Sequence, residues 1–201
     1  MSIYKIVKCS SANSPFYFGG DSAYVSVWPK NPDGQDLLLL FTINCKAARK
    51  QLDRSDLPDS GFIHVFSTYD KEDYFLDFLT FDEVEQKKGI ASYTYVVHVG
   101  QIGAIRSPGL SIPLQYAKFE PSTVKDDEIS VASLVSSGAP CGAVIPKVLE
   151  SNFSFFCQIY SSDFPAPFQD ALYMNDAVGY LLVNKQMGND VADGCFFVQV
   201  A

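Results

Sequence analysis

Few side chains in this sequence are suited to catalysis. Its two histidines, His64 and His98, are the residues that could act as general bases near neutral pH. His64 is flanked by Ile63 and Val65, and His98 falls in the alternating run SYTYVVHV, so both occupy segments typical of β-strands. We therefore interpret both imidazoles as parts of a sheet and predict no catalytic residue.

Cysteine and metal chemistry are weakly supported. Cys141, in SSGAPCGAVIP, is the best candidate nucleophile, but its glycine and proline neighbours equally suit an ordinary turn. The five cysteines show no CxxC spacing, and the sequence has no HxH or HExxH motif. The acidic residues at 70–73 and 126–128 lack the alternate spacing of a calcium loop. The sequence thus predicts reduced thiols, no metal and no cofactor.

Rings and acids are interleaved in the segment 163–176, DFPAPFQDALYMND. Protein interfaces favour aromatic anchors surrounded by a polar rim. We therefore predict that the partner-binding residues are Asp163, Phe164, Phe168, Asp170, Tyr173 and Asp176.

The charge is unevenly distributed. The net charge is −8; residues 1–118 hold 12 basic and 13 acidic side chains, whereas residues 119–201 hold three basic and ten acidic ones. This argues against nucleic acid or an anionic membrane surface as a partner and favours a basic protein. Since no apolar run is long enough to cross a bilayer and the start does not resemble a signal peptide, we expect a cytoplasmic protein.

Short aromatic and β-branched runs dominate the chain and predict strands. They cover 24–28, 37–44, 62–69, 74–79, 93–99, 112–118, 153–160, 180–183 and 195–200. Helices are expected at 45–52, 82–88 and 126–136, with a short turn at 146–150. The expected fold class is α+β, predominantly antiparallel β, in a single domain of residues 1–201 with subregions of about 18–118 and 119–201.

The sequence also contains an internal echo. LLFTIN at 39–44 aligns with FFCQIY at 155–160. Downstream of each, DSGFIHVF at 59–66 corresponds to DAVGYLLV at 176–183. We expect two pseudo-repeated units, each a strand, a short helix or turn, and a second strand entered through Gly61 or Gly179, around a shared core.

The pieces that frame this echo resemble the YwqG-like family of bacterial cytosolic proteins. They are Gly19-Gly20, Trp28-Pro29, Ile43-Asn44, LPDSGFIHVF, Gln158-Ile159, the turn at 176–179 and the closing GCFFVQV. The resemblance covers most of residues 18–200 but is poor at about 100–150. It implies a duplicated, mainly β architecture and no assigned chemistry, and some similar proteins look like immunity partners encoded beside secreted toxins.

Together these observations predict a non-enzymatic protein-binding module. The expected role is an immunity protein that neutralises a cognate, basic toxin domain by occlusion through an acidic surface. The alternative is a small-ligand-binding protein or an enzyme with a pocket between the two repeats, using Trp28, His64, His98, Arg106 or Cys141.

Overall fold

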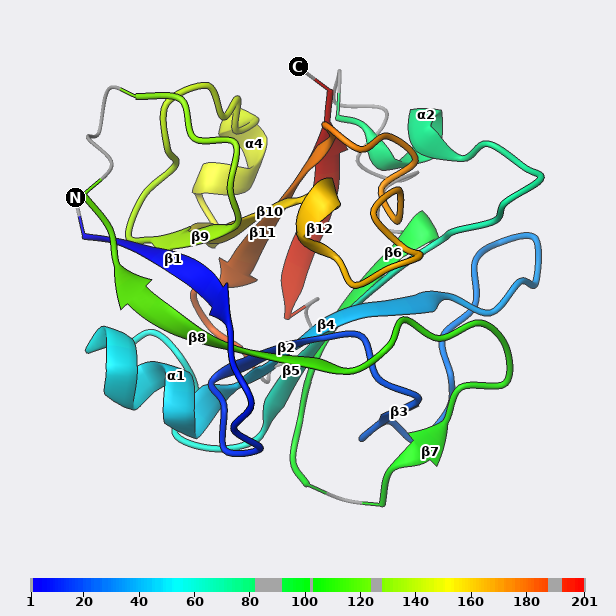
Figure 1. Ribbon diagram of the computed structural model, residues 1–201, viewed down its shortest axis with the longest axis horizontal. Helices are drawn as coiled ribbons and strands as arrows, with labels where there is room; N and C mark the ends of the chain where they lie inside the picture. Colours follow the sequence, from blue (N-terminus) through cyan, green and yellow to red (C-terminus); the bar gives the residue numbers. More distant parts are fainter. Residues whose placement is uncertain (1, 82–91, 102, 124–127, 188–192, 201) are drawn as a thin grey trace.

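The computed structural model describes residues 2–81, 92–101, 103–123, 128–187 and 193–200 (Figure 1). Its strands are β1 (Ile3–Lys8), β2 (Phe16–Phe18), β3 (Ser22–Ala23), β4 (Leu38–Asn44), β5 (Phe62–Ser67), β6 (Thr94–Val99), β7 (Ile105–Arg106), β8 (Gln115–Pro121), β9 (Leu134–Ser136), β10 (Phe153–Tyr160), β11 (Val178–Asn184) and β12 (Gly194–Gln199). Helices are α1 (Cys45–Leu52), α2 (Leu76–Leu79) and α4 (Lys147–Glu150), with a 3₁₀ turn η1 (Ser161–Asp163).

Ten of these strands form one antiparallel sheet in the order β12-β11-β10-β9-β1-β8-β2-β4-β5-β6, while β3 and β7 pair separately. The two edge strands of the large sheet, β6 and β12, approach each other. The Thr94 hydroxyl on β6 donates a hydrogen bond to the Phe196 carbonyl on β12 over 3.0 Å. The sheet is therefore a nearly closed, barrel-like structure, and its unpaired edges are largely covered.

The hairpins β4–β5 and β10–β11 have the same local irregularity. The register shifts between Leu39 and Phe41 in the first hairpin, and between Phe155 and Cys157 in the second. Gly61 precedes β5 with a φ of +86°, as the expected glycine turn requires. Gly179 instead lies inside β11, where a Cβ would come within 2.3 Å of the Phe196 ring, so it allows close packing and does not form a turn.

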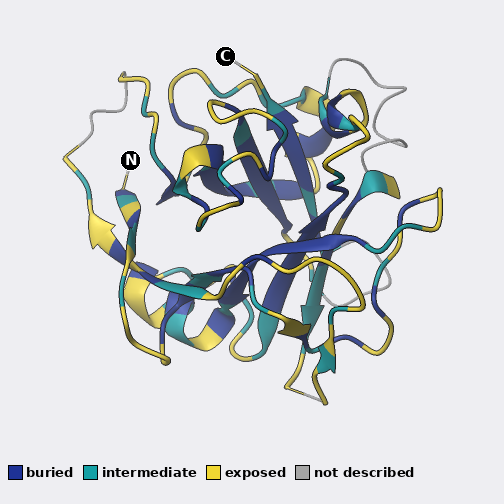
Figure 2. Cartoon of the chain, turned by 45° about the vertical axis from the view of Figure 1, so that its right-hand side comes forward, coloured by how far each residue is buried: buried dark blue, intermediate teal, exposed yellow. Residues whose placement is uncertain are grey.

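Phenylalanine rings fill the interior. Phe16 stacks on Phe41 at 5.1 Å between ring centroids, and Phe41 meets Phe196 edge-on at 5.8 Å. One core cluster takes buried residues from both expected subregions, from Ile6 to Val198. In Figure 2 the strands β4, β5, β10 and β11 are mostly dark, whereas β1, β6 and β8 alternate between buried and more exposed residues. Close packing of rings from both halves means that neither half has a complete core alone.

The expected helix at 45–52 is confirmed as α1. The Asn44 side chain accepts a hydrogen bond from the Ala47 amide and caps the first turn, and Arg49 and Lys50 lie in the last turn. Cys45, Ala48 and Leu52 form the buried face. The short turn at 146–150 is also present, as α4.

Three expectations about local structure were wrong. Within the expected strand at 74–79, residues Leu76–Leu79 form the helix α2, whose Leu76 and Leu79 lie three positions apart on one buried face, and residues 74–75 are in no helix or strand. Residues 24–28 lie outside any strand. In the expected helix at 126–136, described residues 128–133 are non-helical and the rest form β9, which pairs between β1 and β10. The expected helix at 82–88 lies outside the described residues.

Arg54 connects the two subregions. Its guanidinium pairs with Asp56, donates to the Ser136 carbonyl over 3.0 Å, and lies 5.4 Å from the centroid of the Phe156 ring. Its hydrogen bonds hold the pKa of Asp56 below its usual range.

We expect Arg54→Met to lower the free energy of unfolding by about 1–2 kcal/mol, because strand carbonyls lose a charged donor and Asp56 loses its partner. Urea denaturation measures this change. Lys46→Met, at an exposed position on α1, is the control and should change stability by less than about 0.5 kcal/mol. Equal effects of the two substitutions would show that Arg54 does not hold the subregions together.

Candidate functional site

Two segments that are about 100 residues apart in the sequence form an acidic hollow. Residues 69–74, after β5, line it together with residues of the loop after η1, and its volume is about 480 Å³. We call this site the acidic hollow; its lining residues are Tyr69, Asp70, Lys71, Glu72, Asp73, Tyr74, Pro167, Asp170 and Tyr173. It therefore combines four carboxylates with three tyrosine rings.

Hydrogen bonds between the two segments hold the hollow together. The Tyr69 hydroxyl donates to Asp170 Oδ1 over 3.0 Å, and the Tyr173 hydroxyl accepts from the Asp70 amide over 3.2 Å. Asp70 in turn accepts the Glu72 amide over 2.8 Å, which fixes the turn. Burial, reinforced by Asp170, raises the pKa of Tyr69 to about 12, so its phenol stays a neutral donor.

Other carboxylates in the hollow are available to a partner. Glu72 and Asp73 are exposed, and within the described ranges their side-chain oxygens have no hydrogen-bond or ion-pair partner. Tyr74 beside them is 59% exposed and meets Tyr173 edge-on at 5.4 Å. Unpaired acids next to ring faces suit a lysine or arginine side chain, which can pair with a carboxylate and lie over a ring.

An exposed aromatic rim continues from the hollow along α2. Phe78 is 46% exposed and stacks on Tyr93 at 4.5 Å between ring centroids. The Tyr93 hydroxyl donates to Asp33 over 3.0 Å. Acids and accessible rings thus lie together on this side of the protein, as in the core and rim of many protein interfaces.

The predicted partner-binding residues do not lie on one surface. Phe164 and Phe168 are buried in the core, at 1% and 5% exposure, and Asp163 accepts a hydrogen bond from the Ser133 amide over 2.8 Å. Asp176 is exposed, whereas Asp170 and Tyr173 line the acidic hollow. Nothing in the sequence indicated that residues 69–74 belong to the same site, because the acidic residues at 70–73 were tested only as a calcium loop, whose spacing they lack.

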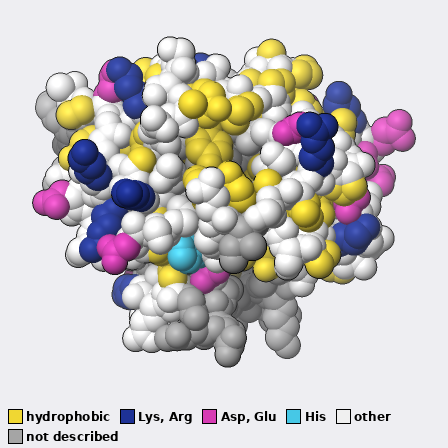
Figure 3. Space-filling view, turned by 90° about the horizontal axis from the view of Figure 1, so that it is seen from below, with side chains coloured by type: hydrophobic (Ala, Val, Ile, Leu, Met, Phe, Trp, Pro, Cys, Tyr) yellow, Lys and Arg dark blue, Asp and Glu magenta, His cyan; other side chains and the backbone are white. Residues whose placement is uncertain are grey.

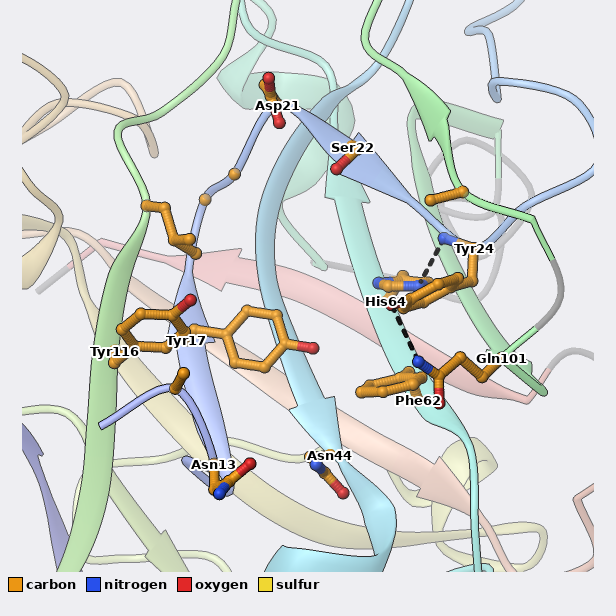
Figure 4. A pocket seen from close by; sticks show the side chains of 15 residues that line it. Asn13, Tyr17, Asp21, Ser22, Tyr24, Asn44, Phe62, His64, Gln101 and Tyr116 are labelled. Carbon is orange, nitrogen blue, oxygen red and sulfur yellow. Dashed lines mark hydrogen bonds between the residues drawn. The ribbon is translucent and has the colours of Figure 1, made fainter. Parts of the chain in front are cut away.

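His64 lines a second cavity, a cleft of about 440 Å³ on the sheet (Figure 4). Its Nε2 accepts a hydrogen bond from the Tyr24 amide over 3.1 Å, and its Nδ1 lies 2.8 Å from the Thr42 hydroxyl. An Nε2 that accepts carries no proton, so we assign the proton to Nδ1, which donates to Thr42. Burial lowers the pKa of His64 to about 4. Both nitrogens are occupied by the protein, and this arrangement does not resemble a general base poised at neutral pH.

The remaining candidates do not line this cleft with His64. Trp28 donates its indole N–H to the Leu37 carbonyl over 2.8 Å, and the His98 Nε2 lies 2.9 Å from the Ser60 carbonyl. Arg106 is exposed on β7, and Cys141 is exposed in a turn. The described residues that line the cleft run from Ala12 to Tyr116, so none of them comes from the second subregion and the cleft does not lie between the two.

Among the described residues, no group of three or more histidine, cysteine, aspartate or glutamate side chains is placed to hold a metal ion. No described helix is both long enough and apolar enough to span a bilayer.

Figure 3 shows a face on which lysine, arginine and acidic side chains lie mostly toward the margins, with uncharged side chains in the middle.

The chain matches no protein-family model and no curated protein sequence. The resemblance to the YwqG-like family therefore stays a prediction.

Proposed function

We propose that the protein binds a basic partner protein through the acidic hollow, and that it acts by covering the partner's surface, without chemistry of its own. The observation that carries this proposal is that the exposed carboxylates of Glu72 and Asp73, which have no partner among the described residues, line one cavity with the exposed ring of Tyr74 and the carboxylate of Asp170. In such a module, charge raises the rate of encounter and the rings supply contact area.

The partner that fits best is a toxin domain of the same bacterial cell, which the protein would neutralise by occlusion in the cytoplasm. The excess of acids over bases in residues 119–201 adds a long-range attraction for a basic domain. The sequence resemblance to the YwqG-like family, some of whose members look like immunity proteins, suggests the same role.

The fold proposal includes two pseudo-repeated units. Three observations support it: the sheet order divides into β12-β11-β10-β9-β1 and β6-β5-β4-β2-β8, the register shifts fall at aligned positions of β4 and β10, and each hairpin has an equivalent hydrogen bond just beyond it. Those bonds run from the Cys45 amide to the Gly61 carbonyl and from the Ser161 amide to the Ala177 carbonyl, both over 3.0 Å. Duplication of a five-strand unit explains why the two halves share a core.

The binding proposal is tested with the purified protein and the product of the gene adjacent to its own. We expect Glu72→Gln/Asp73→Asn to lower the association rate constant about tenfold at low salt, because two steering charges are lost. Surface plasmon resonance at low and high salt measures this, and the wild type should lose the same advantage as salt increases.

The matched control is Glu150→Gln, which removes an exposed charge on α4, away from α2 in Figure 1. It should leave the rate nearly unchanged. If the adjacent gene product does not bind, or if all three proteins associate at the same rate, the acidic hollow is not the docking site for that protein.

A further inference from the structure

The cleft beside His64 contains more hydrogen-bonding groups than the fold uses. Figure 4 shows Asn13 and Asn44 at one end, Asp21 and Ser22 at the other, and the Tyr17 hydroxyl between them, pointing across the cleft toward the side of Phe62. Tyr17 comes from β2, and Tyr116 comes from the adjacent β8. These side chains converge from strands that are neighbours only in the folded sheet.

Several of these groups lack an internal partner. In the part of the chain that the structure describes, the hydroxyls of Tyr17 and Tyr116 and the side-chain amide of Asn13 make no hydrogen bond. Asn44 uses its Oδ1 to cap α1, which leaves its amide nitrogen available. Burial raises the pKa of Tyr17 above its ordinary value, so its hydroxyl keeps its proton and can both donate and accept.

The charge of the lining selects the class of ligand. The described residues of the lining include no lysine or arginine, and the one carboxylate among them is that of Asp21. A phosphate or carboxylate ligand would therefore find no counter-charge and would be repelled by Asp21. The site suits a neutral ligand whose groups can act both as donors and as acceptors, because the lining mixes amides, hydroxyls and a carboxylate.

The ring geometry argues against a flat aromatic ligand. Tyr24 and Phe62 already stack on each other at 4.8 Å between centroids, and Tyr17 meets Tyr116 at an interplanar angle of 72°. No empty slot between parallel rings is formed by these two pairs. Ring edges and hydroxyls around an open, polar cleft instead suit a ligand with hydroxyl groups at its edge and C–H groups on its faces.

We propose that this cleft is a binding site for a neutral sugar of one or two rings. The volume of about 440 Å³ is within the range of small-molecule pockets. The site is separate from the acidic hollow, so it adds a function that does not depend on binding of a protein partner. Glycoside hydrolysis typically uses two carboxylates, whereas the described lining holds the one of Asp21, so the proposal is binding without cleavage.

The test is an NMR titration of the ¹⁵N-labelled full chain with glucose, galactose, N-acetylglucosamine and maltose, and separately with inorganic phosphate and AMP. We expect saturable shifts at cleft residues with at least one sugar below about 50 mM. Tyr17→Phe/Tyr116→Phe should raise the Kd for that sugar about tenfold, since two hydroxyls are lost while both rings remain.

Tyr4→Phe, on β1 and outside the cleft lining, is the control and should leave the Kd unchanged. Thermal melts of all variants show whether each is folded. No saturable shift with any sugar, or shifts that the double substitution leaves unchanged, would overturn the proposal. Stronger binding of phosphate or AMP in the cleft would overturn the assignment to a neutral ligand.

Discussion

Phe164→Ala should lower the free energy of unfolding by about 3–5 kcal/mol, because truncation of a fully buried ring leaves a cavity that the surroundings fill only in part. Phe164 is 1% exposed and meets the Phe18 ring edge-on at 5.3 Å. Urea denaturation of the purified variant measures the loss. A protein of ordinary stability would lose much of its margin through this one substitution.

Met174→Ala is the matched control because it lies in the same segment but is 36% exposed. It should change stability by less than about 0.5 kcal/mol. If Phe164→Ala is as mild as Met174→Ala, the ring is accessible in solution, and the original expectation of a contact residue would be restored.

His64 should make the protein acid-sensitive. The unfolded chain takes up a proton at this imidazole near pH 6.5, but the folded protein does so only near pH 4, because burial disfavours the charged form. The unfolded state therefore binds more protons between these values. The free energy of unfolding therefore has its full value, as far as His64 is concerned, above pH 6.5. It falls as the pH decreases, by about 2 kcal/mol between pH 8 and pH 5. Protonation of Nε2 would also break its bond from the Tyr24 amide.

The measurement compares urea denaturation at pH 8 and pH 5 for the wild type and for His64→Gln. The variant is less stable at pH 8, since it lacks the ring, but the loss between the two pH values should be about 2 kcal/mol smaller than in the wild type. Carboxylates such as Asp56 titrate in both proteins and cancel from the comparison. Parallel losses in the two proteins would show that His64 is not held neutral by the fold.

Local sequence was sufficient where a segment's own pattern decides its structure. The run at 37–44 predicted a strand, its residues 37–41 are all apolar, and residues Leu38–Ile43 of β4 are all buried. The alternation at 93–99 predicted a half-buried strand, and in β6 Thr94 and Val96 are buried while Tyr95 is exposed. The helix α1 could be predicted from the sequence because its capping residue, its basic last turn and its buried face all lie within one short segment.

Tertiary pairing decided the segments whose own pattern was ambiguous. From the sequence, residues Leu134–Ser136 were expected to end a helix. They instead form a short buried strand, because β1 and β10 supply hydrogen-bonding partners on both sides. The rings of Phe164 and Phe168 looked like surface anchors because acids surround them in sequence. Their burial depends on Phe18 and Tyr69, which are distant in sequence.

The composition and order of residues by themselves determined that the chain is mostly β, carries its excess of acid in residues 119–201, and has few groups suited to catalysis. The acidic hollow and the cleft arose only in the folded chain, because the hollow joins Asp70 to Asp170 and the cleft joins Tyr17 to Tyr116. Strand and helix signals act over a few residues, whereas a binding site requires side chains brought together by closure of a sheet over long separations in sequence.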